Sequence, residues 1–287
     1  MIQKSVWIDP ASGKQMDLEE YIDDSPWLGD YAVFNMMIYA EPGEGKTPLL
    51  GSVIDCERMM PALLIDCDSG TLSIRKNENL KTIHLSEMAA QMTLKEKREI
   101  SPWNCIELIY SWLRTGQHNF RTVMLDGGSE IEKHCEMECI SYAINTRLTD
   151  GKNHDPELAE LGDYRRIQSR MKRMYMRYRD IITVDGRRVN LIATAHESMK
   201  RDDTSGMMTI QPMFLGKGSP MITSVFDIVG RLAVVDTKEK KEVKCLVCKI
   251  VGKARGRDRS GGFKEGYIAE PTMLKVANSI WGPNEAL

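Results

Sequence analysis

A short glycine-rich stretch near the start of the chain has residue types that bind phosphate. Gly43 and Gly45 precede Lys46 and Thr47, directly after an apolar run. Because glycine has no Cβ, the backbone N–H groups of such a loop can wrap around a phosphate, and the start of the following helix adds partial positive charge. Lys46 could reach the β- and γ-phosphates of a nucleoside triphosphate, and the Thr47 hydroxyl could bind Mg²⁺. We predict an ATP and Mg²⁺ site formed by Pro42, Gly43, Glu44, Gly45, Lys46, Thr47 and Pro48.

The same stretch fits the P-loop pattern G-x-x-x-x-G-K-[ST], with Ala40 in place of the first glycine. A strand-like run over residues 33–39 precedes it and a helical segment follows, which is the setting that the motif requires. Pro48 falls in the first helical turn, where its missing N–H costs little. The motif predicts a P-loop nucleoside triphosphatase.

Two further apolar runs end in carboxylates. Residues 122–125 lead to Asp126, which we expect to bind Mg²⁺ together with Thr47. Residues 62–65 lead to Asp66 and Asp68. We interpret Asp68 as the base that orients or deprotonates the attacking water and Asp66 as a neighbouring structural acid. A turn or helix-capping role for Asp68 is the alternative.

A fourth run, residues 190–195, delivers His196 to the same carboxyl edge of the expected sheet. A polar side chain there could sense the γ-phosphate and pass its presence to the loop that follows, or it could be a capping histidine. The candidate catalytic residues are Lys46, Asp68, Asp126 and His196.

Apolar runs of strand length recur along the chain, at residues 32–39, 62–65, 122–125, 189–195, 229–235 and 243–251. Helical stretches such as residues 48–58 and 102–114 lie between the early ones. Buried strands that alternate with helices predict an α/β fold of three layers, with a mostly parallel sheet. The last two strands, separated by the charged residues 236–242, predict an antiparallel hairpin at a sheet edge.

A long helix is predicted over residues 162–180. Its apolar side chains follow 3-4-3-4 spacing and should face the core: Tyr164, Ile167, Met171, Met174 and Tyr178. Arginines with the same spacing flank this stripe: Arg166, Arg170, Arg173 and Arg177. They predict either a solvated face or a subunit or nucleic-acid surface.

The composition is that of a globular protein, and the sequence has no apolar run as long as a membrane span. Seven cysteines at irregular spacing are typical of reduced thiols, so we expect a cytoplasmic protein without a membrane partner. Acidic residues dominate the first thirty positions, and basic residues dominate 249–264. The basic run either is solvated or contacts phosphate.

The order of these motifs resembles the RecA-like recombinase core, and more closely the short phage ATPases that carry only that core and promote single-strand annealing. The resemblance covers residues 27–263. It implies an acidic N-terminal extension (1–26), a RecA-like ATPase core (27–270) and a C-terminal tail (271–287). Asp68 stands in the place of the family's catalytic glutamate, and His196 in the place of its γ-phosphate-sensing glutamine. These two differences leave the hydrolysis rate open.

The resemblance also implies two DNA-binding loops, at residues 149–161 and 198–218. The DNA-binding candidates are cations and flexible apolar side chains of the second loop: Lys200, Arg201, Met207, Met208 and Lys217. Lys253 and Arg255 are implied as a finger that reaches the neighbouring subunit's γ-phosphate, unless this basic segment simply faces solvent.

The resemblance implies a DNA-dependent ATPase that assembles as a homo-oligomer, ring or filament, on single-stranded DNA and promotes annealing or recombination. A single-stranded-DNA-binding protein is the implied protein partner, and the host cytoplasm is the implied location for a phage-encoded chain. Two other functions stay open. One is a helicase-like or loader-like motor, and the other is a nucleotide-gated binding module with little turnover.

Overall fold

The computed structural model describes residues 6–8, 15–17, 33–74, 79–147, 154–155, 157–201, 206–236 and 242–283. The chain divides into two compact units, Met1–Ala32 and Val33–Leu287. In the first unit, β1 (Val6–Ile8) pairs with β2 (Gln15–Asp17) in antiparallel orientation. The unit boundary therefore follows residue 32, a few residues after the expected one.

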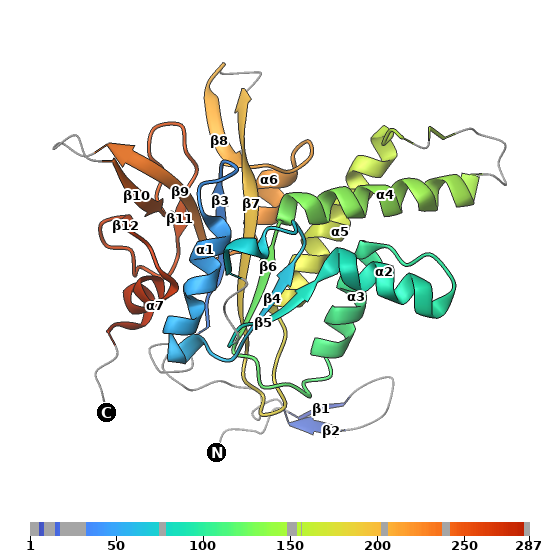
Figure 1. Cartoon of the computed structure of the whole chain (residues 1–287), viewed down its shortest axis with the longest axis horizontal. Helices are drawn as coiled ribbons and strands as arrows, with labels where there is room; N and C mark the ends of the chain where they lie inside the picture. The colour runs from blue at the N-terminus through green and yellow to red at the C-terminus, as the bar shows by residue number, and fades with distance from the viewer. Residues whose placement is uncertain are drawn as a thin grey trace. The chain divides into compact units, whose positions relative to one another are not determined.

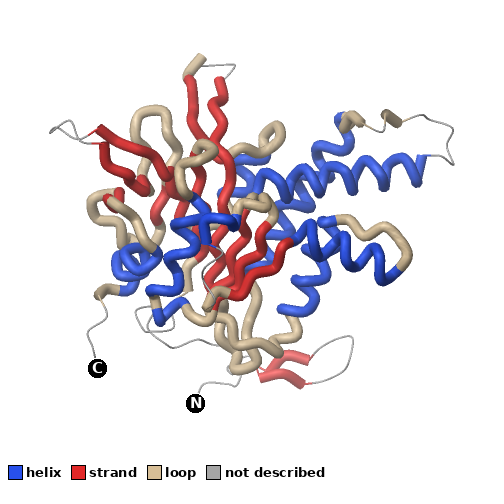
Figure 2. The backbone as a smooth tube through the Cα atoms, in the orientation of Figure 1, coloured by secondary structure: helices blue, strands red, loops and turns tan. Residues whose placement is uncertain are grey.

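The second unit is built on a sheet of ten strands within the described residues. Its main path runs β12-β10-β9-β3-β7-β6-β4-β5, while β8 pairs with β7 and β11 with β9. Figure 2 shows these strands in red between two groups of helices. The strands are β3 (Asn35–Ala40), β4 (Ala62–Asp66), β5 (Lys81–His84), β6 (Thr122–Asp126), β7 (Asn190–Arg201), β8 (Met208–Pro212), β9 (Ile228–Asp236), β10 (Glu242–Val247), β11 (Arg257–Asp258) and β12 (Tyr267–Ala269).

The centre of the sheet is parallel and its β9 side is antiparallel. β3 pairs in parallel with β7 and β9, and β6 with β7 and β4. β9 and β10 form the antiparallel hairpin, with Glu242 opposite Asp236, and β12 adds outside β10. The predicted α/β fold with a mostly parallel sheet and an antiparallel hairpin is confirmed.

Helices cover both faces of the sheet. They are α1 (Lys46–Gly51), α2 (Leu85–Glu96), α3 (Pro102–Leu113), α4 (Gly128–Arg147), α5 (Leu161–Arg179), α6 (Gly218–Thr223) and α7 (Met273–Trp281), with 3₁₀ turns η2 (Ser52–Asp55), η3 (Glu57–Met59) and η4 (Thr71–Ile74). Among the described residues, none of these helices combines the length and apolar character that a membrane crossing requires.

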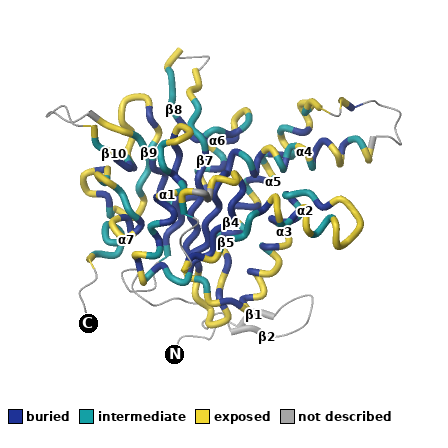
Figure 3. Tube along the Cα trace, viewed as in Figure 1, coloured by how far each residue is buried: buried dark blue, intermediate teal, exposed yellow. Residues whose placement is uncertain are grey.

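Alternate residues of each central strand pack into two separate cores. Met37 and Tyr39 of β3 belong to the core beneath α3, α4 and α5, whereas Met36 and Ile38 belong to the core beneath α1 and α7. This follows from the two-residue repeat of a strand, which sends successive side chains to opposite faces. Figure 3 shows the central strands in the dark blue of buried residues.

Four segments differ from their expected structure. The helix expected over 48–58 ends at Gly51 and continues as 3₁₀ turns, and the strand expected over 243–251 ends at Val247. Residues 198–218, expected as a long loop, contain the β7–β8 hairpin and the start of α6. Residues 271–287, expected as a tail, contain α7, whose Met273 and Val276 are fully buried.

The predicted long helix is α5. Ile167, Met171, Met174 and Tyr178 are buried, and the Tyr178 hydroxyl donates a hydrogen bond of 2.7 Å to the Ile106 carbonyl of α3. The helix begins with a capping box in which Glu160 and Asp163 exchange side-chain and backbone hydrogen bonds. The apolar stripe therefore anchors α5 against α3 and the sheet.

We predict that Met174→Ala lowers the free energy of unfolding by about 2 to 5 kcal/mol, because it leaves a cavity in the core. Met176→Ala, on the same helix but 38% exposed, is the matched control and should cost less than about 1 kcal/mol. Urea unfolding followed by circular dichroism measures both. Equal costs for the two variants would show that the stripe does not anchor α5.

Candidate nucleotide site

The glycine-rich loop connects β3 to α1 through two left-handed residues. Gly43 has φ +83° and Gly45 has φ +88°, a conformation that residues with a Cβ rarely adopt. The Glu44 N–H donates to the Glu41 carbonyl (3.4 Å), and the Leu49 N–H donates to the Gly45 carbonyl (3.1 Å) as α1 begins. The loop thus turns sharply into the helix and leaves its tip exposed.

The Lys46 ammonium lies inside the loop. Its Nζ donates to the carbonyl oxygens of Ala40 (3.2 Å) and Glu41 (3.1 Å), and the residue is buried. Burial lowers the pKa of Lys46, while the Asp126 and Asp68 carboxylates oppose this shift. Among the described residues, this buried cation has only neutral carbonyls as hydrogen-bond partners, so it is well placed to exchange them for phosphate oxygens.

The Asp126 carboxylate at the end of β6 is buried and accepts two short hydrogen bonds. Thr47 Oγ1 donates to Asp126 Oδ2 and Thr194 Oγ1 donates to Asp126 Oδ1, both at 2.6 Å. Burial raises the pKa of Asp126, and these two hydrogen bonds oppose the rise. Hydroxyl and carboxylate oxygens are ligands that Mg²⁺ prefers, so Thr47 and Asp126 fit the predicted magnesium site.

Asp68 and His196 face each other at the carboxyl edge of the sheet. Asp68 follows β4, and His196 lies within β7 rather than at the start of a helix, so it is not a cap. The distance from His196 Nε2 to Asp68 Oδ2 is 3.7 Å, which is too long for a hydrogen bond. Burial raises the pKa of Asp68, and the nearby imidazole opposes this shift.

Asp66 has the structural role that the sequence suggested. It is buried at the end of β4, where it accepts a hydrogen bond from the Gly70 N–H (3.3 Å) and pairs with His84 Nδ1 (3.0 Å). These contacts fix the turn that carries Asp68.

Two residues of α4 that the sequence did not signal hold the segment after β8. Ser129 Oγ accepts the His196 N–H (3.1 Å) and lies 3.1 Å from the Met213 carbonyl, to which it can donate. Glu132 accepts the Leu215 N–H (2.8 Å), and burial raises its pKa to about 7. Both residues look like ordinary helical positions in the sequence, so no motif identifies them.

Two cations beside the loop were also missed. Arg231 of β9 makes a bidentate ion pair (2.7 and 2.9 Å) with Glu197, the residue after His196. The Nζ of Lys244 on β10 lies 3.0 Å from the position that a Cβ on Gly45 would occupy. Only the pairing of β9 with β3 and β10 brings these side chains to the loop.

Most of the DNA-binding candidates lie on one hairpin. Lys200 and Arg201 end β7 and pair with Thr209 and Met208 of β8, and Met207 is 69% exposed. Figure 1 shows this hairpin extending beyond the rest of the sheet. Lys217 lies apart, directly before α6, and much of the first expected loop, residues 149–161, falls outside the described residues.

Lys253 and Arg255 lie beside the same hairpin. The Ile210 N–H of β8 donates to the Lys253 carbonyl (2.8 Å), and the Arg255 N–H donates to the Ile210 carbonyl (2.9 Å). The Tyr39 hydroxyl of β3 also donates to the Arg255 carbonyl. This basic segment therefore connects the hairpin to the strand that precedes the loop, and its role toward a neighbouring subunit stays a prediction.

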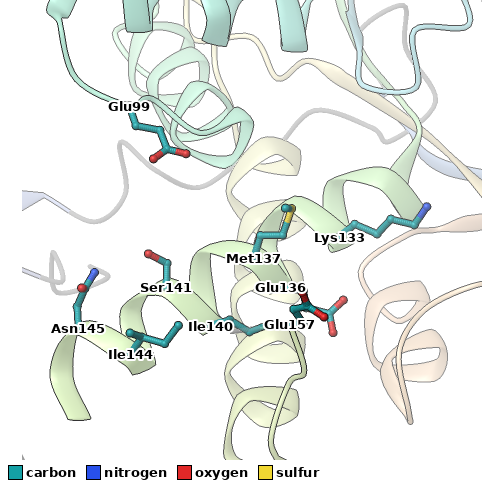
Figure 4. A pocket seen from close by; sticks show the side chains of 9 residues that line it. All are labelled: Glu99, Lys133, Glu136, Met137, Ile140, Ser141, Ile144, Asn145 and Glu157. Carbon is teal, nitrogen blue, oxygen red and sulfur yellow. The ribbon is translucent and has the colours of Figure 1, made fainter. Parts of the chain in front are cut away.

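A hollow on α4 lies apart from these residues (Figure 4). It is lined by Glu99, Lys133, Glu136, Met137, Ile140, Ser141, Ile144, Asn145 and Glu157. Of the predicted site segments, only the first DNA-binding loop contributes a lining residue, Glu157.

Comparison with known structures yields weak similarities. An ATPase of the type III secretion system of pathogenic bacteria is 14% identical, with a TM-score of 0.37. The likeness covers 72% of this chain and 52% of that chain, so it spans about half of that protein. The RadB recombinase is 12% identical, with a TM-score of 0.38 and coverage of 79% of this chain and 82% of that chain. No curated protein matches the sequence.

A family match covers most of the second unit. Residues 33–262 match the AAA domain, a span that includes the glycine-rich loop, Asp126 and His196. The chain belongs to the AAA domain family, and its nucleotide site is that of a P-loop ATPase.

Proposed function

We propose that this chain is an ATPase whose turnover is coupled to single-stranded DNA, and that it assembles on the strand to promote annealing or recombination. The observation that carries the proposal is the continuity of β7. One strand holds Thr194 on the Asp126 carboxylate, presents His196 to Asp68, and then runs to Lys200 and Arg201.

Such a strand can connect nucleotide state to DNA contact. A γ-phosphate near His196 would bias the position of that side chain, and the backbone beyond it leads within a few residues to the hairpin tip. The hairpin combines cations with exposed methionines, which suit the phosphates and base faces of single-stranded DNA. Ser129 and Glu132 fasten the returning segment to α4, so the hairpin base has a fixed support.

The residues at the sheet edge have different roles in ATP hydrolysis. Lys46 binds the β- and γ-phosphates, and Asp68 accepts the proton of the attacking water or orients that water. Thr47 and Asp126 would hold Mg²⁺, which supplies charge neutralisation of the phosphates. His196, which faces Asp68 across 3.7 Å, would sense the phosphate.

Assembly as a homo-oligomer is part of the proposal. Lys253 and Arg255 would approach the nucleotide of a neighbouring subunit and neutralise charge there. Their backbone contacts with Ile210 support this role, because a shift of the hairpin on DNA would move both cations.

A second candidate function is a nucleotide-gated binding module that turns ATP over slowly. Burial raises the pKa of Asp68, and the carboxylate lies 3.7 Å from the His196 imidazole. The raised pKa makes Asp68 a stronger base when it is ionised, but the short side chain of an aspartate reaches less far toward a water molecule than that of a glutamate. A base that lies too far from the attacking water would act slowly. Single-turnover hydrolysis with bound ATP separates the two functions.

We predict that single-stranded DNA stimulates ATP hydrolysis more than double-stranded DNA does. Lys200→Glu/Arg201→Glu should lose this stimulation, because reversed charges on the hairpin repel the phosphate backbone. Lys95→Glu/Arg98→Glu, with the same change of charge at exposed positions near the end of α2, is the control and should keep it. An ATPase rate that is indifferent to DNA in the wild-type chain would contradict the proposal.

We also predict that Lys46→Ala and Asp68→Asn separate binding from turnover. Lys46→Ala should weaken ATP binding by about 2 to 5 kcal/mol, because it removes a buried charge that the phosphates need. Asp68→Asn should preserve binding and slow hydrolysis by about 10² to 10⁴-fold, as expected for loss of a general base. Titration with a fluorescent ATP analogue measures binding, and single-turnover assays measure hydrolysis. Wild-type turnover in Asp68→Asn would exclude Asp68 as the base.

A further inference from the structure

Three side chains from distant parts of the sequence converge beside the nucleotide site. Asp68 follows β4, Glu130 lies in the first turn of α4, and His196 belongs to β7. Each offers one potential ligand atom, and these atoms all lie within 4.8 Å of one another. The cluster therefore combines one imidazole nitrogen with two carboxylate oxygens.

The spacing of the donors suits a shared cation. Asp68 Oδ2 and His196 Nε2 are 3.7 Å apart. Two donors that bind one metal ion at bond lengths near 2.1 Å lie about 3 to 4 Å from each other. The pair is too far apart for a hydrogen bond and is spaced as two ligands of one ion.

The imidazole ring has no hydrogen bond of its own among the described residues. His196 Nδ1 is buried without a partner, and Nε2 faces the Asp68 carboxylate across the 3.7 Å gap. The backbone is fixed instead, because the His196 N–H donates to Ser129 Oγ (3.1 Å) and the His196 carbonyl accepts the Met213 N–H (2.8 Å). The backbone that carries the ring is thus held in place, while Nε2 stays available to a ligand.

A glycine permits the approach of Asp68 to α4. Gly127 has φ +105°, and a Cβ at this position would lie 2.9 Å from the Asp68 Cβ and 3.1 Å from its backbone nitrogen. Any other residue would push the β4 turn away from the start of α4, where Glu130 lies. The cluster depends on this close contact between two loops.

The charge of the cluster favours a cation. The Asp68 and Glu130 carboxylates lie together, and Glu130 reinforces the rise in the pKa of Asp68 that burial causes. Lys133 contacts one oxygen of Glu130 at 2.5 Å, and a carboxylate can hold a lysine on one oxygen and a metal on the other. The charge of Lys46 opposes the rise in the pKa of Asp68, so the cluster interacts electrostatically with the glycine-rich loop.

We propose that Asp68, Glu130 and His196 bind a divalent transition-metal ion at a site separate from the magnesium site of Thr47 and Asp126. An imidazole ligand favours Zn²⁺ or Co²⁺ over Mg²⁺ and Ca²⁺, which prefer oxygen ligands throughout. Three protein ligands leave a coordination position open, as in metal sites that hold a water molecule. Because Asp68 and His196 are the proposed base and phosphate sensor, the ion occupies this site in the nucleotide-free chain.

The test is Co²⁺ binding by the full chain, stripped with a chelator and free of nucleotide and DNA. Excess Mg²⁺ occupies the Thr47–Asp126 site, while visible absorption reports imidazole and carboxylate coordination of Co²⁺ and calorimetry gives the stoichiometry. We expect one Co²⁺ per chain. His196→Gln and Glu130→Gln should each weaken binding by at least about tenfold.

A matched control sharpens the result. His154→Gln removes a histidine that also pairs with a carboxylate, at 2.6 Å from Asp163, and should leave Co²⁺ binding unchanged. Thermal melting by circular dichroism verifies the fold of every variant, and Glu130→Gln, at a partly exposed position, decides the question if His196→Gln unfolds.

Absence of Co²⁺ binding by the folded wild-type chain overturns the inference. So does binding that survives in both His196→Gln and Glu130→Gln, or that is lost equally in His154→Gln. Because ATP and DNA are absent, these outcomes do not depend on whether single-stranded DNA stimulates hydrolysis.

Discussion

The buried carboxylate of Asp126 is the constraint on which the nucleotide site depends. A carboxylate removed from water costs several kcal/mol unless hydrogen bonds or a cation satisfy it. Here Thr47 from α1 and Thr194 from β7 donate to its two oxygens, and the Thr194 hydroxyl also accepts the Gly127 N–H at 2.9 Å. The end of β6, the start of α1 and the middle of β7 must therefore stay in register, since a slip of one residue would send Thr194 to the other face of the sheet.

That register determines what lies beyond the sheet edge. With Thr194 fixed on Asp126, the next outward position on the same face is His196, which meets Asp68 and places its N–H on Ser129. β7 then continues as one arm of a hairpin whose other arm returns to α4 through Met213. Continuous backbone therefore connects the phosphate site to the hairpin, without a long chain of side-chain contacts.

The features that a local sequence pattern encodes were predicted from the sequence. The features that arise from tertiary contacts were not. The glycine-rich loop, the buried parallel strands and the α5 stripe are visible because glycine, apolar runs and 3-4 spacing each have a direct structural cause. Helix α7 could have been predicted from Thr272 as a cap and from the buried spacing of Met273, Val276 and Ala277. The β7–β8 hairpin was missed because its strands leave the core and become polar. Glu130 was missed because a glutamate in a helix becomes a candidate ligand only when the fold brings it close to residues 68 and 196.

The charge at this edge decides how a polyanion can enter it. Asp68, Asp126 and Glu130 contribute three carboxylates, and Lys46 is the buried cation among the described residues that acts on Asp68 and Asp126. Burial raises the pKa of Asp68 and Asp126, because it disfavours their charged forms. A nucleoside triphosphate adds several negative charges, so binding requires compensating cations. Thr47 and Asp126 would hold Mg²⁺, which would compensate for one carboxylate and part of the phosphate charge. Asp68 and Glu130 remain, and in the nucleotide-free chain a second cation held with His196 would compensate for their charge.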